Sequence, residues 1–290
     1  MLLDPAGARV APVDCEAVVR ANARLSADYH VLTLDAPDVA ARTQPGQFVM
    51  VKPGRGLDPL LRRPFSVFQI VRDGAGAPTG VSILGKIVGK GTGLLYGLEP
   101  GERLACLGPL GRPFTPPPAD RPVWFVAGGV GLAPFATLAE ACLARGLRPT
   151  LFYGARRAGD LHYAEWFADR GVDVRAATED GSAGAHGYVT TPLGQALATL
   201  GSDLDANAGA GPSIYVCGPT PMMRAVAQLA SRYGHDVEVS LEQTMGCGMG
   251  GCYSCVVPLV QPGRAPHFVR SCLAGPTFRG SALAWEGLAH

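Results

Sequence analysis

The amino-acid sequence predicts a mixed fold, α/β plus β: an N-terminal antiparallel β-barrel, a doubly wound parallel sheet and a small cysteine-bearing C-terminal subdomain. Three observations predict it. Short β-like runs separated by turn dipeptides fill residues 14–110, as in small antiparallel barrels. From residue 123 onward, apolar strands alternate with helical patterns, which is typical of a parallel α/β sheet. Four of the eight cysteines lie within residues 247–272, so thiol chemistry is expected to organise the tail.

The composition is that of an ordinary globular protein. Of the 290 residues, 47% are apolar and 17% are charged, and the net charge is +1. This balance favours neither nucleic-acid binding nor attraction to an anionic membrane. No apolar run approaches the ~18 residues that a membrane helix needs, and the first residues do not read as a secretory signal. We therefore expect a cytoplasmic protein whose thiols serve as ligands or core fillers.

Six strands and one short helix are expected in the barrel domain, which we place at residues 14–118 after a lead-in at residues 1–13. Turn dipeptides such as Pro45-Gly46 and Pro100-Gly101 separate the elements, since these residues favour tight turns. The expected strands are Glu16–Ala23, Tyr29–Asp35, Gln47–Lys52, Phe65–Val71, Gly80–Ile87 and Glu102–Leu107, and the expected helix is Leu94–Leu98.

A proline-rich run at residues 113–118 is expected to link the barrel to the α/β domain, because prolines neither continue a strand nor enter a helix interior. The α/β domain is then expected over residues 119–241, with the tail over 242–290. The segment Ser202–Pro212 is expected to be a surface loop. The expected strands are Val123–Ala127, Thr150–Tyr153, Val172–Ala177, Ser213–Cys217 and Val237–Leu241, and the expected helices are one that ends near Arg145, Asp160–Asp169, Thr191–Thr199 and Pro221–Tyr233.

The tail cysteines have the spacing of an iron–sulfur ligand set. Cys247, Cys252 and Cys255 follow C-x4-C-x2-C and Cys272 comes later, which is the plant-type pattern for a [2Fe–2S] cluster. Three thiolates must then come from one tight loop, and the glycines among residues 246–251 supply backbone freedom and amide donors. Two alternatives stay open. A four-cysteine zinc site would also use the C-x2-C half, and a disulfide would need an oxidising compartment.

Two short motifs in the barrel are suited to a flavin nucleotide. The motif Arg63-Pro64-Phe65-Ser66 offers a guanidinium for a pyrophosphate, a flat ring and a polar contact. The stretch Gly89–Gly93 opens the expected helix, where backbone amides and the hydroxyl of Thr92 would form an anion cradle beside Gly91. Each motif alone also fits a plain strand start or turn. Together they favour flavin phosphate binding.

Two glycine-containing turns follow apolar strands in the α/β domain. Gly128-Gly129-Val130-Gly131 departs from the G-x-G-x-x-G pattern, yet its glycines would let a dinucleotide approach the backbone near a helix N-terminus. Cys217-Gly218-Pro219 follows a second strand at the same carboxyl edge, where open α/β sheets bind ligands. These turns predict a nicotinamide dinucleotide site. Cys217 is our candidate beside the nicotinamide, and a buried strand-end thiol is the alternative.

Taken in this order, the motifs resemble those of the ferredoxin–NADP⁺ reductase superfamily, and within it the electron-transfer subunits of class 1B dihydroorotate dehydrogenases. The resemblance covers roughly residues 14–280, and the cysteine pattern is its most specific part. The motifs that carry it are Arg63-Pro64-Phe65-Ser66, Gly91-Thr92, Gly128-Gly129-Val130-Gly131, Cys217-Gly218-Pro219 and the ligand set Cys247, Cys252, Cys255 and Cys272.

The resemblance implies an FAD- and [2Fe–2S]-bearing, NAD-linked oxidoreductase subunit of pyrimidine biosynthesis. It also implies a heterotetramer of two such subunits with two FMN-bearing catalytic subunits, with electrons passing from dihydroorotate through FMN, the cluster and FAD to NAD⁺. Leu84, Gly85 and Lys86 would lie at the flavin. Here the sequence departs from the family, which commonly has an aromatic residue followed by Arg where Gly85-Lys86 stands. A lysine cannot make the bidentate contacts of an arginine guanidinium.

Two other functions are compatible with these residues. One is the reductase subunit of another Fe–S oxidoreductase, such as a hydrogenase or a sulfur reductase. The other is a nucleotide-binding regulatory protein whose tail cysteines hold a structural zinc. A flavin exchanges one or two electrons, so it fits between a one-electron cluster and a two-electron nicotinamide. That match favours an electron-transfer subunit.

Overall fold

The computed structural model describes residues 11–54, 56–203, 211–261 and 263–288. Most of the predicted lead-in (1–13) and of the predicted loop Ser202–Pro212 lies outside the described residues. The chain forms two compact units. Unit 1 joins the chain up to Phe114 to residues 243–257 and 268–277, and unit 2 comprises residues 115–242, 258–267 and 278–290. The division into separately folding domains at residues 118 and 241 stays a prediction.

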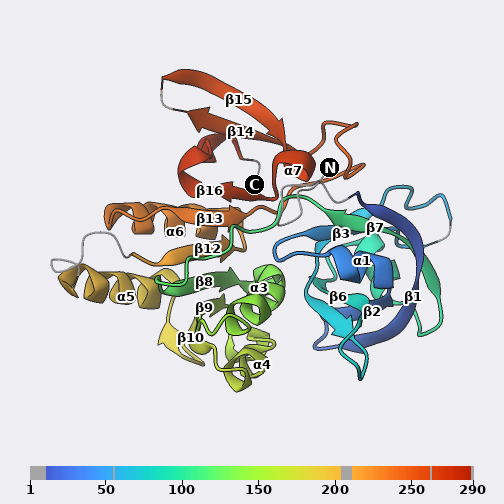
Figure 1. Cartoon of the computed structure of the whole chain (residues 1–290), viewed down its shortest axis with the longest axis horizontal. Coiled ribbons are helices and arrows are strands. Elements are labelled where there is room, and N and C mark those ends of the chain that lie inside the picture. The colour runs from blue at the N-terminus through green and yellow to red at the C-terminus, as the bar shows by residue number, and fades with distance from the viewer. Residues whose placement is uncertain (1–10, 55, 204–210, 262, 289–290) are drawn as a thin grey trace. The chain divides into compact units, whose positions relative to one another are not determined.

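Seven antiparallel strands form the barrel sheet of unit 1, in the order β4-β3-β7-β1-β2-β6-β5 (Figure 1). This sheet confirms the predicted antiparallel barrel. Its strands are β1 (Val13–Arg24), β2 (Tyr29–Asp35), β3 (Phe48–Val51), β4 (Arg63–Ser66), β5 (Gln69–Arg72), β6 (Pro78–Lys86) and β7 (Arg103–Leu110), with helices α1 (Pro37–Arg42) and α2 (Lys90–Tyr96).

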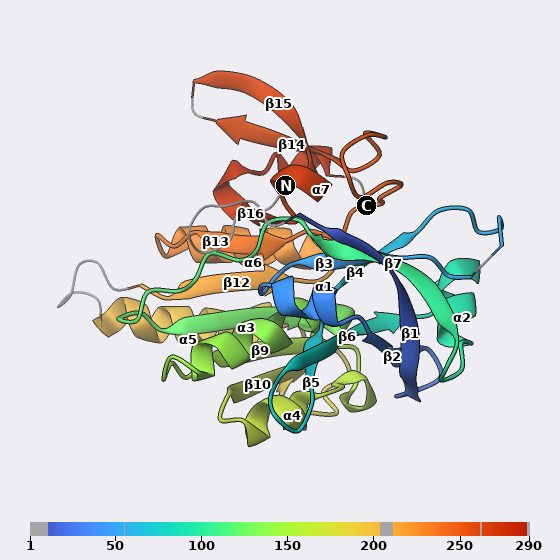
Figure 2. The ribbon, with the colours of Figure 1, turned by 45° about the vertical axis from the view of Figure 1, so that its right-hand side comes forward.

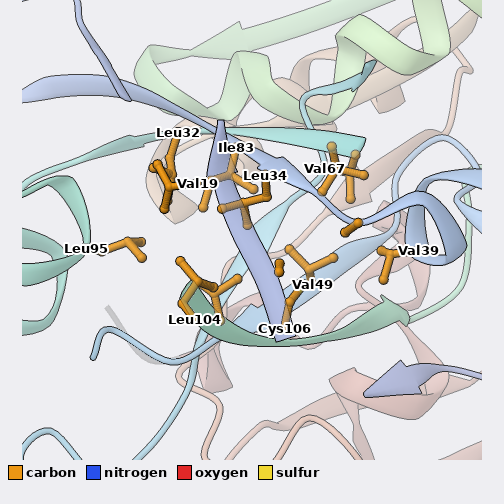
Figure 3. Close-up of a cluster of buried hydrophobic side chains, with 14 of the residues drawn as sticks. Val19, Leu32, Leu34, Val39, Val49, Val67, Ile83, Leu95, Leu104 and Cys106 are labelled. Atoms are coloured by element: carbon orange, nitrogen blue, oxygen red, sulfur yellow. The ribbon is translucent and has the colours of Figure 1, made fainter. Parts of the chain in front are cut away.

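Inward-facing side chains form the barrel core, and one predicted strand is divided in two around it. Alternate residues of each strand point inward, and Leu32, Leu34 and Ile83 pack with neighbouring strands in Figure 3. The single strand predicted over residues 65–71 is two strands, β4 and β5, at opposite edges of the sheet. Between them the backbone of Val67 and Phe68 crosses the barrel, since their amides bond Gln47 and Ser82 respectively.

Five parallel strands form the centre of the unit 2 sheet, whose full order is β11-β10-β9-β8-β12-β13-β16. Figure 2 shows β9 and β10 side by side, as the predicted parallel sheet requires. The strands are β8 (Val123–Gly128), β9 (Thr150–Ala155), β10 (Asp173–Thr178), β11 (Ala185–His186), β12 (Ser213–Cys217), β13 (Val237–Ser240) and β16 (Thr277–Arg279). The helices are α3 (Ala133–Leu143), α4 (Ala164–Asp169), α5 (Thr190–Asp203) and α6 (Thr220–Arg232).

The tail contains a small third sheet that the sequence pattern did not predict. Strands β14 (Val256–Gln261) and β15 (Arg264–Arg270) pair as a hairpin and lead into the short helix α7 (Ser271–Ala274). The hairpin brings Cys272 back toward Cys255, because the amide of Ser271 donates to the carbonyl of Cys255 at 2.8 Å. Of the helices that the structure describes, none has the length and hydropathy required to cross a bilayer.

A buried carboxylate joins the linker to the unit 2 sheet. Glu238 in β13 is 7% exposed, and its Oε1 accepts a hydrogen bond from the amide of Thr115 at 3.0 Å. Burial raises the pKa of Glu238, and the hydrogen bond from Thr115 only partly opposes that shift. Because the folded-state pKa lies above the unfolded value of about 4.3, ionisation in the folded state destabilises the protein as pH rises from about 4 through the folded pKa.

We expect Glu238→Gln to raise the thermal midpoint at neutral pH, because glutamine keeps the acceptor for Thr115 and removes the buried charge. The gain should disappear below about pH 4, where the glutamate is protonated in both states. Each kcal/mol recovered corresponds to about 2–4 °C. Thermal unfolding from pH 4 to 8 measures this, with exposed Glu165→Gln as the control. A gain of equal size at every pH would contradict the assignment.

Candidate functional site

The four predicted ligand cysteines come together within unit 1. Cys255 and Cys272 belong to one buried cluster with Phe48 and Met50 of β3. The thiols interact in two pairs, Cys247 with Cys252 and Cys255 with Cys272. Side chains of β3 and β7, together with Met245, therefore form a layer of apolar side chains beneath the cysteine loop.

Left-handed backbone conformations give the cysteine loop its tight path. Gly248 and Gly250 have φ of +72° and +83°, and Tyr253 has φ of +59°. A Cβ at Gly248 would lie 2.6 Å from Cγ of Met50, so the loop backbone rests directly on that side chain. Glycine is required there for both the conformation and the close approach, as the sequence predicted for this glycine-rich stretch.

Backbone amides of the loop point at sulfur. The amides of Met249 and Gly251 each lie 3.3 Å from Sγ of Cys247. Sγ of Cys252 is 3.2 Å from Oγ of Ser254, which also accepts a hydrogen bond from Gly246 at 2.8 Å. Donors of this kind stabilise thiolates and tune a bound iron–sulfur centre.

The thiol pairs differ in electrostatics. Hydrogen bonds from Ser254 and Cys247 lower the pKa of Cys252 to about 6. Burial, followed by the neighbouring Cys255 and Cys247 thiols, raises the pKa of Cys272 to about 12. Four thiolates at this density repel one another, so a cationic inorganic core would relieve the repulsion, and the donor set fits such a group.

Zinc and a two-iron core would each need all four thiols. Within the described part of the chain, no three His, Cys, Asp or Glu side chains stand close enough together to form a preformed single-ion site. A structural zinc needs four ligands around one centre, whereas a two-iron core takes two thiols per iron. The two pairs of interacting thiols are compatible with the two-iron arrangement. The structure pairs no cysteines as a disulfide.

The flavin motifs converge on one end of the barrel in unit 1. Arg63 at the start of β4 lies against Gly91 of α2, where a Cβ would be 3.1 Å from its Nε. Its Nη1 donates to the carbonyl of Leu61 at 2.8 Å, which holds the guanidinium in place. The hydroxyl of Thr92 accepts hydrogen bonds from the amides of Val88 and Gly89. Thr92 therefore shapes the turn that would form the phosphate cradle.

The departure at Gly85-Lys86 has a structural counterpart that sequence reasoning missed. A Cβ on Gly85 would collide with the hydroxyl of Tyr96 from α2, so Tyr96 fills the space of a side chain at position 85. That hydroxyl is buried and has no hydrogen-bond partner, and its ring stands edge-on to Phe65. Lys86 turns toward β2, with Nζ 3.8 Å from Asp28. The remaining predicted flavin residues, Leu84, Pro64 and Ser66, lie on β6 and β4.

The two predicted nicotinamide turns are adjacent in unit 2. Strand β8 pairs with β12, with Ala127 opposite Cys217, and a Cβ on Gly131 would strike the carbonyl of Cys217. A Cβ on Gly128 would lie 3.0 Å from Cδ of Pro219, and Gly129 and Gly218 have positive φ. The Cys217 thiol is 1% exposed, and burial raises its pKa well above the usual range. It is therefore a neutral thiol at the carboxyl edge, and its catalytic role stays a prediction.

Comparison with known families matches both parts of this arrangement. Residues 242–284 match the family model described as the iron–sulfur cluster binding domain of dihydroorotate dehydrogenase B. Residues 125–228 match the oxidoreductase NAD-binding domain. The first match contains all four predicted ligand cysteines, and the second contains both glycine turns.

Full-length relatives extend the likeness over nearly the whole chain. The electron transfer subunit of dihydroorotate dehydrogenase B (NAD(+)) of Desulforamulus reducens is 35% identical over 93% of this chain and 98% of its own length. That of Geobacillus kaustophilus is 37% identical over 92% and 98% respectively.

Solved structures share the fold. An NADH-dependent reduced ferredoxin–NADP oxidoreductase, studied for flavin-based electron bifurcation, superposes with a TM-score of 0.76 at 27% identity, covering 94% of this chain and 91% of that one. A ferredoxin reductase of carbazole 1,9a-dioxygenase superposes with a TM-score of 0.65 at 24% identity, covering 79% and 68%. The second likeness shows the fold alone.

We expect Gly248→Ala to empty the cysteine site. A left-handed φ costs a residue with a Cβ roughly 1–2 kcal/mol, and the new Cβ would also strike Met50. Iron and acid-labile sulfide per chain, measured after anaerobic purification, should fall several-fold. Gly251→Ala is the matched control, because its Cβ would meet nothing within 4 Å and the amide that faces Cys247 is retained. Equal iron content in the two variants would contradict this account of the loop.

Proposed function

Because this chain belongs to the family of electron-transfer subunits of NAD-dependent dihydroorotate dehydrogenase B, we propose that it holds a [2Fe–2S] cluster and FAD and connects both to NAD. The observation that carries the proposal is the convergence of four thiols, in two pairs, on the barrel that also bears the flavin motifs. When bound, FAD exchanges electrons singly or in pairs and so matches a one-electron cluster to a two-electron nicotinamide.

The [2Fe–2S] assignment is supported by spacing and pairing together. The ligands would be Cys247 with Cys252 on one iron and Cys255 with Cys272 on the other, as their contacts pair them. The loop amides that face Cys247 would hydrogen-bond the cluster ligands. The proposed cluster needs reduced thiols, which agrees with a cytoplasmic location.

The FAD assignment is supported by the position of β4 within unit 1. Strand β4 pairs with β3 in a register that sets Pro64 opposite Met50, and Met50 supports the cysteine loop at Gly248. The proposed flavin strand and the proposed cluster loop are thus separated by one strand. Residues Arg63 to Ser66, with Gly91 and Thr92, would hold the flavin nucleotide, and Leu84, Gly85 and Lys86 would border it.

The NAD assignment follows the carboxyl edge of the unit 2 sheet. The turns Gly128–Gly131 and Cys217–Pro219 lie there, with Gly129 half-buried and Pro219 exposed, and ligands of open α/β sheets bind at this edge. Gly129 and Gly218 have positive φ, a backbone conformation that forms tight turns. A pyrophosphate could approach the backbone amides of these turns. We place Cys217 beside the nicotinamide as a neutral thiol, held by its hydrogen bond with Ser240.

A partner surface is supported by exposed apolar side chains in the cysteine loop and in β15. Met249 and Tyr253 of the loop are 60% and 62% exposed, and Phe268, two residues before the Arg270 that contacts Tyr253, is 70% exposed. Exposed large apolar side chains that gather on one surface mark interaction sites. We propose that they contact the FMN-bearing catalytic subunit in a heterotetramer of two plus two. Electrons would then enter at the proposed cluster, whose ligand Cys252 adjoins Tyr253 in the loop.

Purification of the full chain with its cellular partner tests the function. We expect yellow-brown protein containing FAD, iron and acid-labile sulfide, accompanied by an FMN protein that oxidises dihydroorotate. Stoichiometric zinc without iron would overturn the electron-transfer function. If the partner is instead a hydrogenase or a sulfur reductase, the chain would be assigned as the reductase subunit of that oxidoreductase.

Cys252→Ser separates the roles of the two cofactors. We expect the iron–sulfur bands to bleach and electron transfer with the partner to stop, because serine is a poor fourth ligand to a soft iron–sulfur core. FAD-dependent oxidation of NADH by artificial acceptors should largely survive. Cys15→Ser, in β1 of the barrel, is the control that should keep the bands. Loss of NADH oxidation in Cys252→Ser would contradict the separate roles assigned to FAD and the cluster.

Arg63→Ala tests the flavin site without reference to the cluster. Loss of a charge-assisted contact to phosphate should weaken FAD binding at least about tenfold, which is about 1.4 kcal/mol. Fluorescence titration of the deflavinated protein measures it. Arg62→Ala is the control, since Arg62 pairs with Asp14 at 2.7 Å. Equal loss of FAD affinity in both variants would remove Arg63 from the site.

A further inference from the structure

One charged side chain stands within the two segments of unit 1 that carry the cysteines. Residues 243–257 and 268–277 contain no Asp, Glu, Lys or His, and Arg270 is their sole charge. The residues of β3 and β7 that pack beneath them are apolar as well. Arg270 is half-buried, so water screens its charge only partly, and the charge acts on a neighbouring anionic centre more strongly than that of a fully solvated cation.

Arg270 is fixed against the cysteine loop on two sides. Its Nη1 donates to the carbonyl of Gly250 at 2.7 Å. Its guanidinium also lies over the ring of Tyr253, 4.8 Å from the ring centroid, within the range of a cation–π contact. Both partners belong to the loop between Cys247 and Cys255, whereas Arg270 stands two residues before Cys272. The side chain therefore ties the two ligand-bearing segments together.

The contact at Gly250 reaches the sulfurs through peptide groups. The carbonyl of Gly250 and the amide of Gly251 belong to one peptide, and that amide faces Sγ of Cys247 at 3.3 Å. The amide of Gly250 itself hydrogen-bonds Cys272. A cation on the carbonyl polarises the peptide and strengthens the bond at its amide end. Through the peptide groups of Gly250 and Gly251, Arg270 is therefore linked to Cys247 in one thiol pair and to Cys272 in the other.

We propose that Arg270 is a positioning residue that aligns the Gly250 and Gly251 amides on the sulfurs and, by its charge, raises the reduction potential of the cluster. This inference rests on the proposed function. Reduction adds one electron to a centre that is already anionic, so a fixed cation and better amide donors both favour the reduced form. Gly250 and Gly251 supply the donors, and Arg270 sets their geometry.

The experiment is a redox titration of the cluster in the holoprotein, followed by electron paramagnetic resonance, with iron content measured on the same samples. Arg270→Gln keeps an N–H donor for Gly250 but loses the charge, and we expect its midpoint to move to a more negative potential. Arg270→Lys keeps the charge and should return most of the shift. Arg232→Gln, the same change at the end of α6 in unit 2, should match the wild type.

Each outcome decides the proposal. An Arg270→Gln protein with full iron content and an unchanged midpoint would overturn it. If Arg270→Gln fails to hold iron, Arg270→Lys decides: retained iron there supports a required positive charge, and lost iron would overturn the electrostatic role. Absence of iron from the wild type would instead refute the proposed function, so the two failures are distinguishable.

Discussion

The tail of unit 1 is organised by the need to bring four cysteines together, whose sulfurs would repel one another as thiolates. The chain meets this constraint with backbone geometry more than with charge. Left-handed residues at Gly248 and Gly250 fold the loop tightly, and loop amides face Cys247. The hairpin of β14 and β15 returns Cys272 to Cys255 through a single hydrogen bond at Ser271. Apolar packing beneath the loop then holds these segments together without opposing charges.

Strand β3 is the element that both halves of unit 1 share. Val49 and Val51 face the barrel core, whereas Phe48 and Met50 pack with Cys255 and Cys272. Alternation along a strand places these pairs on opposite faces. Four consecutive apolar residues can therefore serve two cores at once, and β4, with the flavin motif, pairs along the same strand.

Sequence patterns predicted the parts of this molecule that local chemistry dictates. The cysteine spacing, the glycine turns and nearly all barrel and sheet strands follow from residue type and period, and the structure confirms the fold they imply. The tail hairpin was missed because residues 256–270 mix Pro, Gly and His with apolar residues and show no clear alternation. Tyr96 was missed because its importance depends on the empty space at Gly85, which only the fold brings near. Arg270 could have been found, since it is the one charge among the tail cysteine segments.

The register of one strand pair fixes the spacing between the two proposed cofactor sites. A slip of β3 by one residue would turn Phe48 and Met50 into the barrel and present Val49 and Val51 to the cysteine loop. Valine is shorter than methionine, so the loop backbone at Gly248 would lose its support, and bulkier side chains would overfill the barrel. Both cores therefore oppose the slip. The register also sets Pro64 opposite Met50, so the packing that stabilises the fold also holds the strand that carries the proposed flavin motif at one strand's width from the thiols.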